Sequence, residues 1–562
     1  MRIKLKLIKQ KSFFLKQYVL SLKTILKTII KGVRLKNNDI EIKTTSNNFG
    51  TLLYTVPLLP PISLPLLPST PLPDPPILLV MIGTLIVFTV LISLVPEEDE
   101  SNIRMLALIG SIGFFLMCVD TWWFFDPLDT DLQLAFEIPI IPEYNFFLTC
   151  GIDGITLPFI LLIAFVIPIC LSGPGTIFVN FKQFTLLVLI IEIFLILCIC
   201  TNNLLCFYIF FECVLIPMYI LIGVWGGRDR KKKASFYFFL YTLFGSFFLL
   251  WGIVYIGTTV GSFDYPILSM YIANANLEEH NKLIWLCFFI PFAIKIPMFP
   301  FHLWLPEAHV EAPTIGSVIL ASLLLKLGGY GLIRFTLPLF PLGSVYFQPF
   351  VVVIAIAGVI YGAFSAIRQT DLKRIIAYSS IAHMNLAVLG LFSFTHQGID
   401  GAIYLMVGHG IVSAALFLCV GNISDRYHTR SLKYFSGLVK VMPLFSGILF
   451  LFTLANMSFP GTSNFVGEFL IFVAMYEHNI WMALFAATGI VFSAVYSIWL
   501  FNRISFGTLK TTTNASHYAD LNRSEFYMFL MLLIPMLLLG VYSGCITTVT
   551  SLPVNAIVEL YT

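Results

Sequence analysis

The sequence predicts an all-α polytopic membrane protein of about fourteen transmembrane helices, with two inverted five-helix repeats and two broken helices. Hydrophobic residues make up 58% of the 562 residues and charged residues only 11%, whereas soluble domains average about 25% charged residues. Apolar runs close to the length that a bilayer requires, about 20 residues, recur from residue 77 to residue 546. Proline or glycine interrupts two of these runs at corresponding places, which supports the repeat.

The apolar runs define a transmembrane domain at residues 77–546 and leave a C-terminal tail at 547–562. The stretches 121–150 and 258–282 lack such runs, so we expect them to be exposed loops. The predicted spans are 77–95, 103–120, 155–172, 183–201, 203–224, 235–257, 283–305, 312–336, 349–367, 374–394, 399–421, 443–472, 480–503 and 527–546.

Residues 1–76 differ from everything that follows. Met1 to Lys36 holds eleven basic residues and no acid, with apolar residues between them, within a basic N-terminal extension at 1–56. This pattern fits an amphipathic helix on a membrane surface, an organelle transit peptide or an ordered surface extension. Residues 57–76 hold nine prolines, which predicts an extended, polyproline-type strap that cannot form a spanning helix.

Short basic loops predict the orientation of the chain. They lie at 228–233, 368–374, 426–440 and 503–510, and an even number of predicted helices separates each from the next. All four therefore fall on one face, which the positive-inside rule makes the cytoplasmic face, or the matrix face in a mitochondrion. The acidic loop at 97–100 falls on the same face and the basic N-terminus on the opposite one, and both depart from the rule.

Two spans are broken by helix-disrupting residues. The first break is the segment 291–306, which holds Pro297, Pro300 and Pro306, and the second is the run Ser458 to Ser463 in the span 443–472, five helices later. Because five is odd, a five-helix unit repeated in tandem inserts upside down the second time, with repeats roughly at 183–336 and 349–503. Paired interrupted helices at corresponding positions indicate an ion site near the middle of the membrane.

Titratable residues lie where lipid would make them costly. Glu212, Lys326, His383 and His409 are central in their predicted helices, Lys295 precedes the first break, and Glu468 follows the second. A charge at the membrane centre costs roughly 2.5–3.5 kcal/mol on insertion scales, so such residues usually line an ion path. Two structural alternatives remain open: an ion pair between Glu212 and Lys295, and hydrogen-bonded interior histidines at 383 and 409.

The other polar residues have plainer interpretations. His302 and His309 flank Pro306 as junction residues rather than metal ligands, and Glu192 is expected to pack near a helix end with Asn202 and Asn203. Charges expected at the membrane interfaces are Glu307, Glu311, Arg334 and Arg374. The ten cysteines show no zinc or disulfide spacing, and no nucleotide-binding motif is visible. Metal and cofactor sites are therefore not expected in this chain, and a net charge of +3 is too small to indicate nucleic-acid binding.

Several runs resemble the signatures of one protein family. The run from Lys295 to Thr314 (KIPMFPFHLWLPEAHVEAPT) and Lys326 resemble the antiporter-like subunits of respiratory complex I and the related cation/proton antiporters. Further runs narrow the resemblance to the complex I side of the family: Leu148–Thr156 (LTCGIDGIT), Phe210–Met218 (FFECVLIPM), Asp371–Ser380 (DLKRIIAYSS), His383–Asn385 (HMN) and Ser458–Glu468 (SFPGTSNFVGE).

The resemblance implies a proton-translocating membrane subunit. In the family, Glu212 and Lys295 would hold and release charge, Lys326, His383 and His409 would continue a polar axis, and Glu468 would end it. The family also implies that NADH, FMN, iron–sulfur clusters and ubiquinone bind to partner subunits. The implied partners are other membrane-arm subunits of complex I and lipids, and the implied location is the mitochondrial inner membrane.

Two alternatives use the same sequence. A free-standing cation/proton antiporter would use the same intramembrane residues without partner subunits. A membrane scaffold with fortuitous ion pairs would not need them, and replacing Lys326 by methionine would then be harmless.

Overall fold

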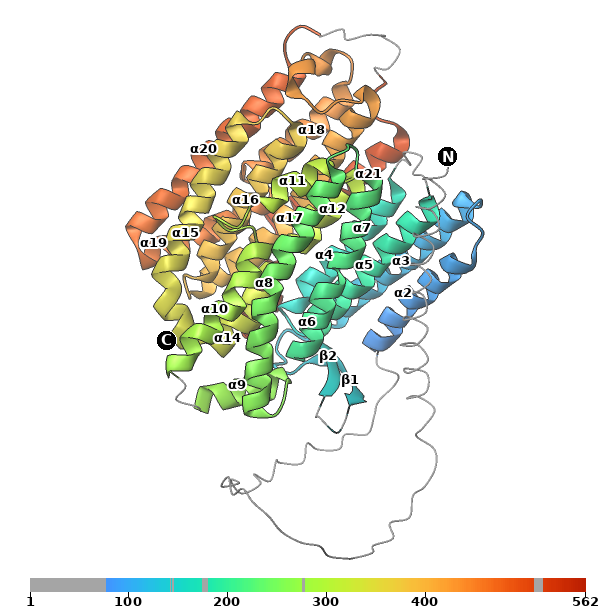
Figure 1. Ribbon diagram of the computed structural model, residues 1–562. Coiled ribbons are helices and arrows are strands. Elements are labelled where there is room, and N and C mark those ends of the chain that lie inside the picture. The colour runs from blue at the N-terminus through green and yellow to red at the C-terminus, as the bar shows by residue number, and fades with distance from the viewer. Residues whose placement is uncertain are drawn as a thin grey trace, which may run out of the picture. The chain divides into compact units, whose positions relative to one another are not determined.

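The computed structural model describes residues 77–141, 143, 146–173, 180–274, 278–509 and 519–561 (Figure 1). The basic extension and the proline-rich strap expected at 1–76 lie outside this part of the chain. The described part is mostly helical and holds eleven helices that are long and apolar enough to cross a membrane. Three shorter apolar helices accompany them, Thr156–Ser172, Pro443–Asn456 and Gly544–Val558. The chain is a multi-pass membrane protein.

The helices follow the predicted spans within a few residues, and several extend beyond them. The first half contains α2 (Ile77–Leu94), α3 (Glu100–Phe124), β1 (Gln133–Ile141), β2 (Phe146–Ile152), α4 (Thr156–Ser172), α5 (Phe181–Cys200), α6 (Leu204–Cys213), α7 (Leu215–Trp225), α8 (Lys231–Val260), α9 (Tyr265–Asn274), α10 (Glu278–Lys295), α11 (Trp304–Glu311), α12 (Thr314–Ile319), α13 (Leu325–Gly331) and α14 (Leu337–Leu339). The second half contains α15 (Pro341–Arg368), α16 (Leu372–Leu391), α17 (His396–Tyr427), α18 (Pro443–Asn456), α19 (Ser463–His478), α20 (Ile480–Ser505), α21 (Arg523–Val541) and α22 (Gly544–Val558).

Helix α17 lies at the centre of the bundle. The most apolar part of α17 is completely buried, and α16 and the helical run Thr314–Leu339 are nearly as enclosed. Helices α16, α18, α19, α21 and α22 pack against α17, as does α12 from the first half of the chain. By contrast, α2, α3 and α21 leave most of their surface free. Polar residues on the central helices are therefore shielded from lipid by the protein itself.

The basic loops gather at one end of the bundle, as predicted. Arg228 forms an ion pair with Asp371 at 3.4 Å, which joins the loop before α8 to the loop before α16. Backbone hydrogen bonds link Leu372 to Arg430 and Gly437 to Phe506. These contacts connect all four loops, so we call this end of the bundle the basic face and the opposite end the outer face.

The outer face is more structured than the sequence suggested. The stretch 121–150, expected to be a loop, contributes most of an antiparallel hairpin, in which Phe136 pairs with Cys150 and Ile138 with Leu148. The stretch 258–282, also expected to be a loop, contains α9, which lies at the same end as the hairpin in Figure 1. The expected tail forms most of α22. None of the three contains an apolar run of about 20 residues, so the hydrophobic pattern of the sequence did not predict them.

Both predicted breaks are present. Helix α10 ends at Lys295 and α11 begins at Trp304, whose indole Nε1 donates a hydrogen bond of 2.9 Å to the freed carbonyl of Ile294. Helix α18 ends at Asn456 and α19 begins at Ser463, with Gly461 between them in the left-handed region that favours glycine. Each break frees backbone groups from the helical pattern, and part of each is buried, as at Met298 in the first break and Ser458 in the second.

The helical run Thr314–Leu339, which follows α11, is not a regular α-helix throughout. Two π-helical turns interrupt it, at Leu320–Leu324 and Leu332–Thr336. A π-helical turn contains an extra residue and often marks a functional position. The first of these turns ends two residues before Lys326.

Candidate functional site

Glu212 and Lys295 face each other from α6 and the end of α10. The Lys295 ammonium is buried and lies 4.4 Å from the centroid of the Phe211 ring. Glu212 interacts electrostatically with Lys295, and the nearby Ser246 hydroxyl donates a hydrogen bond of 2.9 Å to the carbonyl of Leu243. Among the described residues, neither Lys295 Nζ nor Glu212 Oε1 has a hydrogen-bond partner. The tight ion pair considered as an alternative is therefore not formed, and the two charges are close without being bonded.

Lys326 is held by the π-helical turn that precedes it. Its Nζ donates a hydrogen bond of 2.6 Å to the carbonyl of Ala321, five residues back, and lies 3.0 Å from His409 Nδ1. Both side chains are almost completely buried. Because an ammonium only donates, His409 Nδ1 accepts from a charged Lys326 and can take over its proton.

Three further polar side chains lie beyond His409 on the side away from Lys326. Its Nε2 lies 3.2 Å from Ser380 Oγ on α16, and its ring is 5.5 Å from the ring of His383, centroid to centroid. His383 Nδ1 in turn lies 2.9 Å from Glu468 Oε1 on α19. Lys326, His409, His383 and Glu468 therefore form a buried row, which we call the central file; its two histidine rings are neighbours without a hydrogen bond between them.

The pair and the central file are neighbours without a direct bond. The backbone of α10 touches α13 where Gly328 packs: a Cβ on Gly328 would lie 3.0 Å from the Phe292 carbonyl and 3.1 Å from the Ile296 nitrogen. Lys295 and Lys326 are thus one and two residues from this contact. Among the described residues, however, no hydrogen bond joins Lys295 to the central file.

The structure adds two groups that the sequence did not single out. Tyr496 on α20 places its hydroxyl 3.4 Å from His383 Nε2. Lys373, at the basic end of α16, is buried and bonds to the Ala312 carbonyl at 2.8 Å and to Ser317 Oγ at 3.1 Å. A tyrosine on a neighbouring span and a lysine near a loop look ordinary in sequence, because only packing shows that they turn inward.

The two junction histidines are buried rather than exposed in a loop. Neither ring of His302 or His309 has a hydrogen-bond partner among the described residues. The ring of His309 stacks on Phe417 at 4.6 Å, and that of His302 lies 4.9 Å from Tyr361. Glu192 is also buried in the interior of α5, not near a helix end, and both its oxygens lack a partner in the described part of the chain.

The charges expected at interfaces divide into two groups. Glu307 and Arg374 are about one-third exposed and form an ion pair at 2.6 Å near the basic face, as expected. Arg334 is instead buried, where it pairs with Asp153 and donates to Asn202 at 2.8 Å. Glu311 is 2% exposed. Across the described residues, no group of three or more His, Cys, Asp or Glu side chains could hold a metal ion.

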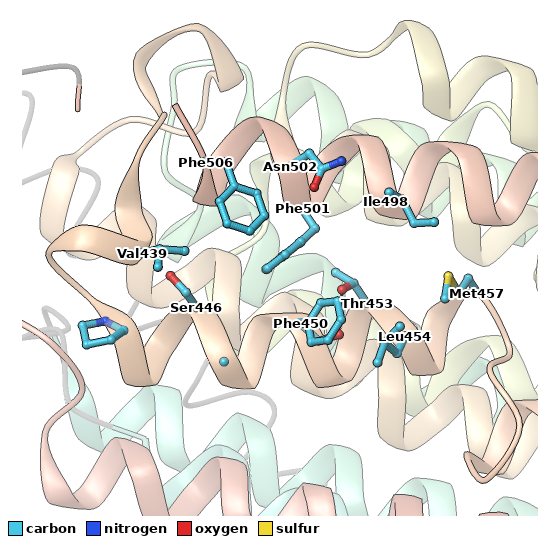
Figure 2. Close-up of a pocket in the computed structure, with 12 residues that line it drawn as sticks. Val439, Ser446, Phe450, Thr453, Leu454, Met457, Ile498, Phe501, Asn502 and Phe506 are labelled. Atoms are coloured by element: carbon cyan, nitrogen blue, oxygen red, sulfur yellow. Dashed lines mark hydrogen bonds between the residues drawn. The ribbon is translucent and has the colours of Figure 1, made fainter. Parts of the chain in front are cut away.

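An apolar groove of about 570 Å³ lies between α18 and α20 and is separate from these residues (Figure 2). Figure 2 shows Phe450, Phe501 and Phe506 along it. None of the predicted site residues lines this groove. The candidate site is therefore a row of side chains packed between helices, not a ligand pocket.

The chemistry available to this row is proton transfer. Each member can hold or release a proton, and the state of a neighbour biases which of the two it does. Distances of 2.9–3.2 Å between consecutive heavy atoms at Lys326–His409, His409–Ser380 and His383–Glu468 are within proton-transfer range.

Comparison with known proteins places this arrangement in a family. Residues 201–493 match the family model described as NADH:quinone oxidoreductase/Mrp antiporter, TM. The chain is 47% identical to NADH-ubiquinone oxidoreductase chain 4 of Marchantia polymorpha, over 83% of this chain and 92% of the relative. It is 46% identical to the chain 4 protein of Arabidopsis thaliana, over 81% and 91%.

A solved structure is also similar to the chain. A chain of respiratory complex I from Thermus thermophilus with bound NADH superposes with a TM-score of 0.77 and 29% sequence identity. The match covers 86% of this chain and 100% of that chain.

Proposed function

Because the chain belongs to the NADH:quinone oxidoreductase/Mrp antiporter family, and within it to the chain 4 proteins of NADH-ubiquinone oxidoreductase, we propose that it conducts protons along the central file. It is a membrane subunit of complex I, and other membrane-arm subunits of that complex are its partners. Oxidation of NADH by ubiquinone takes place in the complex, and this subunit pumps protons.

The observation that carries the proposed path is the buried row from Lys326 to Glu468, in which Lys326 contacts His409, His383 contacts Glu468, and the two histidine rings lie 5.5 Å apart, centroid to centroid. Lys326 would pass a proton to His409, and Ser380 and the adjacent ring of His383 would carry it on to Glu468. The Glu212–Lys295 pair would set when Lys326 loses its proton, since a positive charge brought close to an ammonium favours its neutral form. Water would bridge the space between the pair and the file, because unpartnered buried polar atoms are commonly satisfied by water.

The finer architecture is part of the same proposal. We infer fourteen spanning segments and two inverted five-helix repeats, at 183–336 and 349–503, within a domain at 77–546. Helix α10 approaches its break from the outer face and α18 approaches its break from the basic face, as inverted repeats require. The proposed location is the mitochondrial inner membrane, with the basic face toward the matrix and lipid around the bundle.

Redox cofactors belong to partner subunits in this proposal. NADH, FMN, iron–sulfur clusters and ubiquinone would bind elsewhere in complex I, and this chain would contribute only the proton path. The segments 1–56 and 57–76 would be an N-terminal extension and a strap outside the transmembrane domain.

The test is Lys326→Met in assembled complex I reconstituted into liposomes. Methionine keeps the volume of the buried side chain but cannot carry a proton, so we expect proton pumping driven by NADH and ubiquinone to be lost while the complex still assembles. Lys440→Met, which removes an exposed lysine on the basic face, is the matched control. Normal pumping in the assembled Lys326→Met complex would support the scaffold interpretation instead.

A second measurement separates a subunit from a free-standing antiporter. The purified chain alone, placed in liposomes, should show little cation/proton exchange, because its proton path would depend on partner subunits for its driving force. Vigorous exchange by the lone chain would favour the antiporter.

A further inference from the structure

A second titratable pair lies at the outer end of α17, beyond the central file. His396 is the first residue of the helix and Asp400 lies one turn later. Helix α17 has 32 residues and ends beside the basic face, so its length of about 48 Å carries its first turn past a hydrocarbon core of about 30 Å. The His396 side chain is 39% exposed and that of Asp400 only 5%. The pair therefore spans the step from water to the buried interior.

Both oxygens of Asp400 are engaged. His396 Nδ1 lies 3.2 Å from Oδ2, and Thr550 on α22 donates a hydrogen bond of 2.7 Å to Oδ1. Among the described residues, His396 is the titratable side chain that lies within ion-pair distance of this carboxylate. Titratable groups toward this end of the packed helices are Tyr404 on α17, Glu468, Tyr476, Glu477 and His478 on α19, and Cys545 on α22.

The pair lies near Glu468, the last member of the central file, where α17 and α19 are in contact. A Cβ on Gly401 of α17 would lie 3.0 Å from the carbonyl of Gly467 on α19, so the two backbones are in contact at this level. Asp400 and Glu468 are the residues next to these glycines. With about 3.8 Å between consecutive Cα atoms, their Cα atoms lie within roughly 12 Å of each other.

We propose that Asp400 and His396 form the outer port of the proton path, that is, the site where protons pass from Glu468 to water at the outer face. This inference rests on the proposed function of the central file. The acid form of Glu468 gives its proton through a bridging water to the Asp400 carboxylate: an O–H bond breaks at Glu468 and one forms at Asp400. Asp400 passes the proton to Nδ1 of neutral His396, and the imidazolium releases one from Nε2 to water. Asp400 is then a carboxylate again, and His396 is neutral again but carries its proton on Nδ1, so proton exchange between its exposed ring and water has to restore the Nε2–H form. Glu468 is left as a carboxylate and regains its proton from His383.

The competing explanation is structural: the hydrogen bond from Thr550 to Asp400, which we call the tie, holds α22 against α17. Two substitutions separate the explanations. Asp400→Asn keeps an oxygen that accepts from Thr550 but cannot carry a proton, whereas Thr550→Val removes the tie and keeps the carboxylate. Thr548→Val, which removes an exposed hydroxyl from the same helix, reports the background effect of such a change on α22.

The experiment measures proton release per NADH oxidised by assembled complex I in liposomes, with Glu468→Gln as the reference for the central file. We expect Asp400→Asn and Glu468→Gln each to lose most of the release, and Thr550→Val to retain more of it than Asp400→Asn. A release by Asp400→Asn equal to that of the wild type, beside a defective Glu468→Gln, would overturn the port and leave the central file intact. Equal losses in Asp400→Asn and Thr550→Val would assign the effect to the tie. Normal release by Glu468→Gln would instead overturn the proposed function.

Discussion

The two broken helices hold their charges in opposite ways. At the first break, Lys295 lies over the Phe211 ring and near Glu212, but no hydrogen bond reaches its Nζ from the described residues. At the second break, Glu468 is bonded to His383 at 2.9 Å, and His383 also contacts Tyr496. Both sites are buried beside interrupted helices, so burial alone does not explain the difference.

This contrast suggests that the residues at the two breaks have different roles. A charge without fixed partners can change its distance from a neighbour at little cost, because no hydrogen bond has to be broken. The central file, by contrast, offers protons a fixed route, since each of its side chains already contacts the next. The first break is thus suited to switching and the second to conducting, and the following substitutions test that distinction.

The largest expected effect comes from removing a proton carrier from the central file. Glu468→Gln keeps the size of the side chain but removes its ability to take a proton from His383. General acid–base groups contribute about 10²–10⁴-fold to a transfer, so we expect proton release by reconstituted complex I to slow by at least about tenfold. Glu477→Gln, on the same helix near the outer face, is the control. Unchanged release by Glu468→Gln would show that the row is structural.

The next prediction compares the energetic coupling within two residue pairs, His383–Glu468 and Glu212–Lys295. A double-mutant cycle with His383→Gln and Glu468→Gln should give a coupling of about 1–3 kcal/mol in the free energy of unfolding, as expected for bonded neighbours. The cycle with Glu212→Gln and Lys295→Met should give about 0.5 kcal/mol or less, near the limit for additive sites. Denaturation of the detergent-solubilised complex, followed for this subunit, would provide both values. Equal couplings would remove the contrast between the breaks.

The sequence predicted the charged residues of this site better than their contacts. Glu212, Lys295, Lys326, His383, His409 and Glu468 stood out because lipid makes each of them costly. Their connections depend on features without a sequence period: the π-helical turn before Lys326, and the inward turn of Tyr496. The outer hairpin, α9 and α22 were missed because they are not full apolar spans. Burial of Arg334 was missed because its partner Asp153 is 181 residues away.

A smaller effect should come from the aromatic ring beside Lys295. Phe211→Leu removes the ring face that lies 4.4 Å from the ammonium, and a cation–π contact contributes about 0.5–1 kcal/mol at exposed sites and about 2 kcal/mol when desolvated. Phe207→Leu, equally buried on the same helix, provides the cost of the lost ring alone. We expect the Phe211 variant to lose that additional amount in the free energy of unfolding. Equal losses would mean that the ring does not stabilise the charge.

The smallest effect should come from Tyr496→Phe, which removes one hydroxyl from the edge of the conducting row. At 3.4 Å from His383 Nε2 the contact is long, so its loss should cost less than the typical hydrogen-bond contribution of about 1 kcal/mol. Proton release should fall by less than about fivefold, since 1.4 kcal/mol corresponds to a factor of ten. Tyr476→Phe, at an exposed position on α19, should leave the release unchanged. A loss as large as that of Glu468→Gln would make Tyr496 a member of the row, and the proton would then leave His383 toward α20 as well as toward α19.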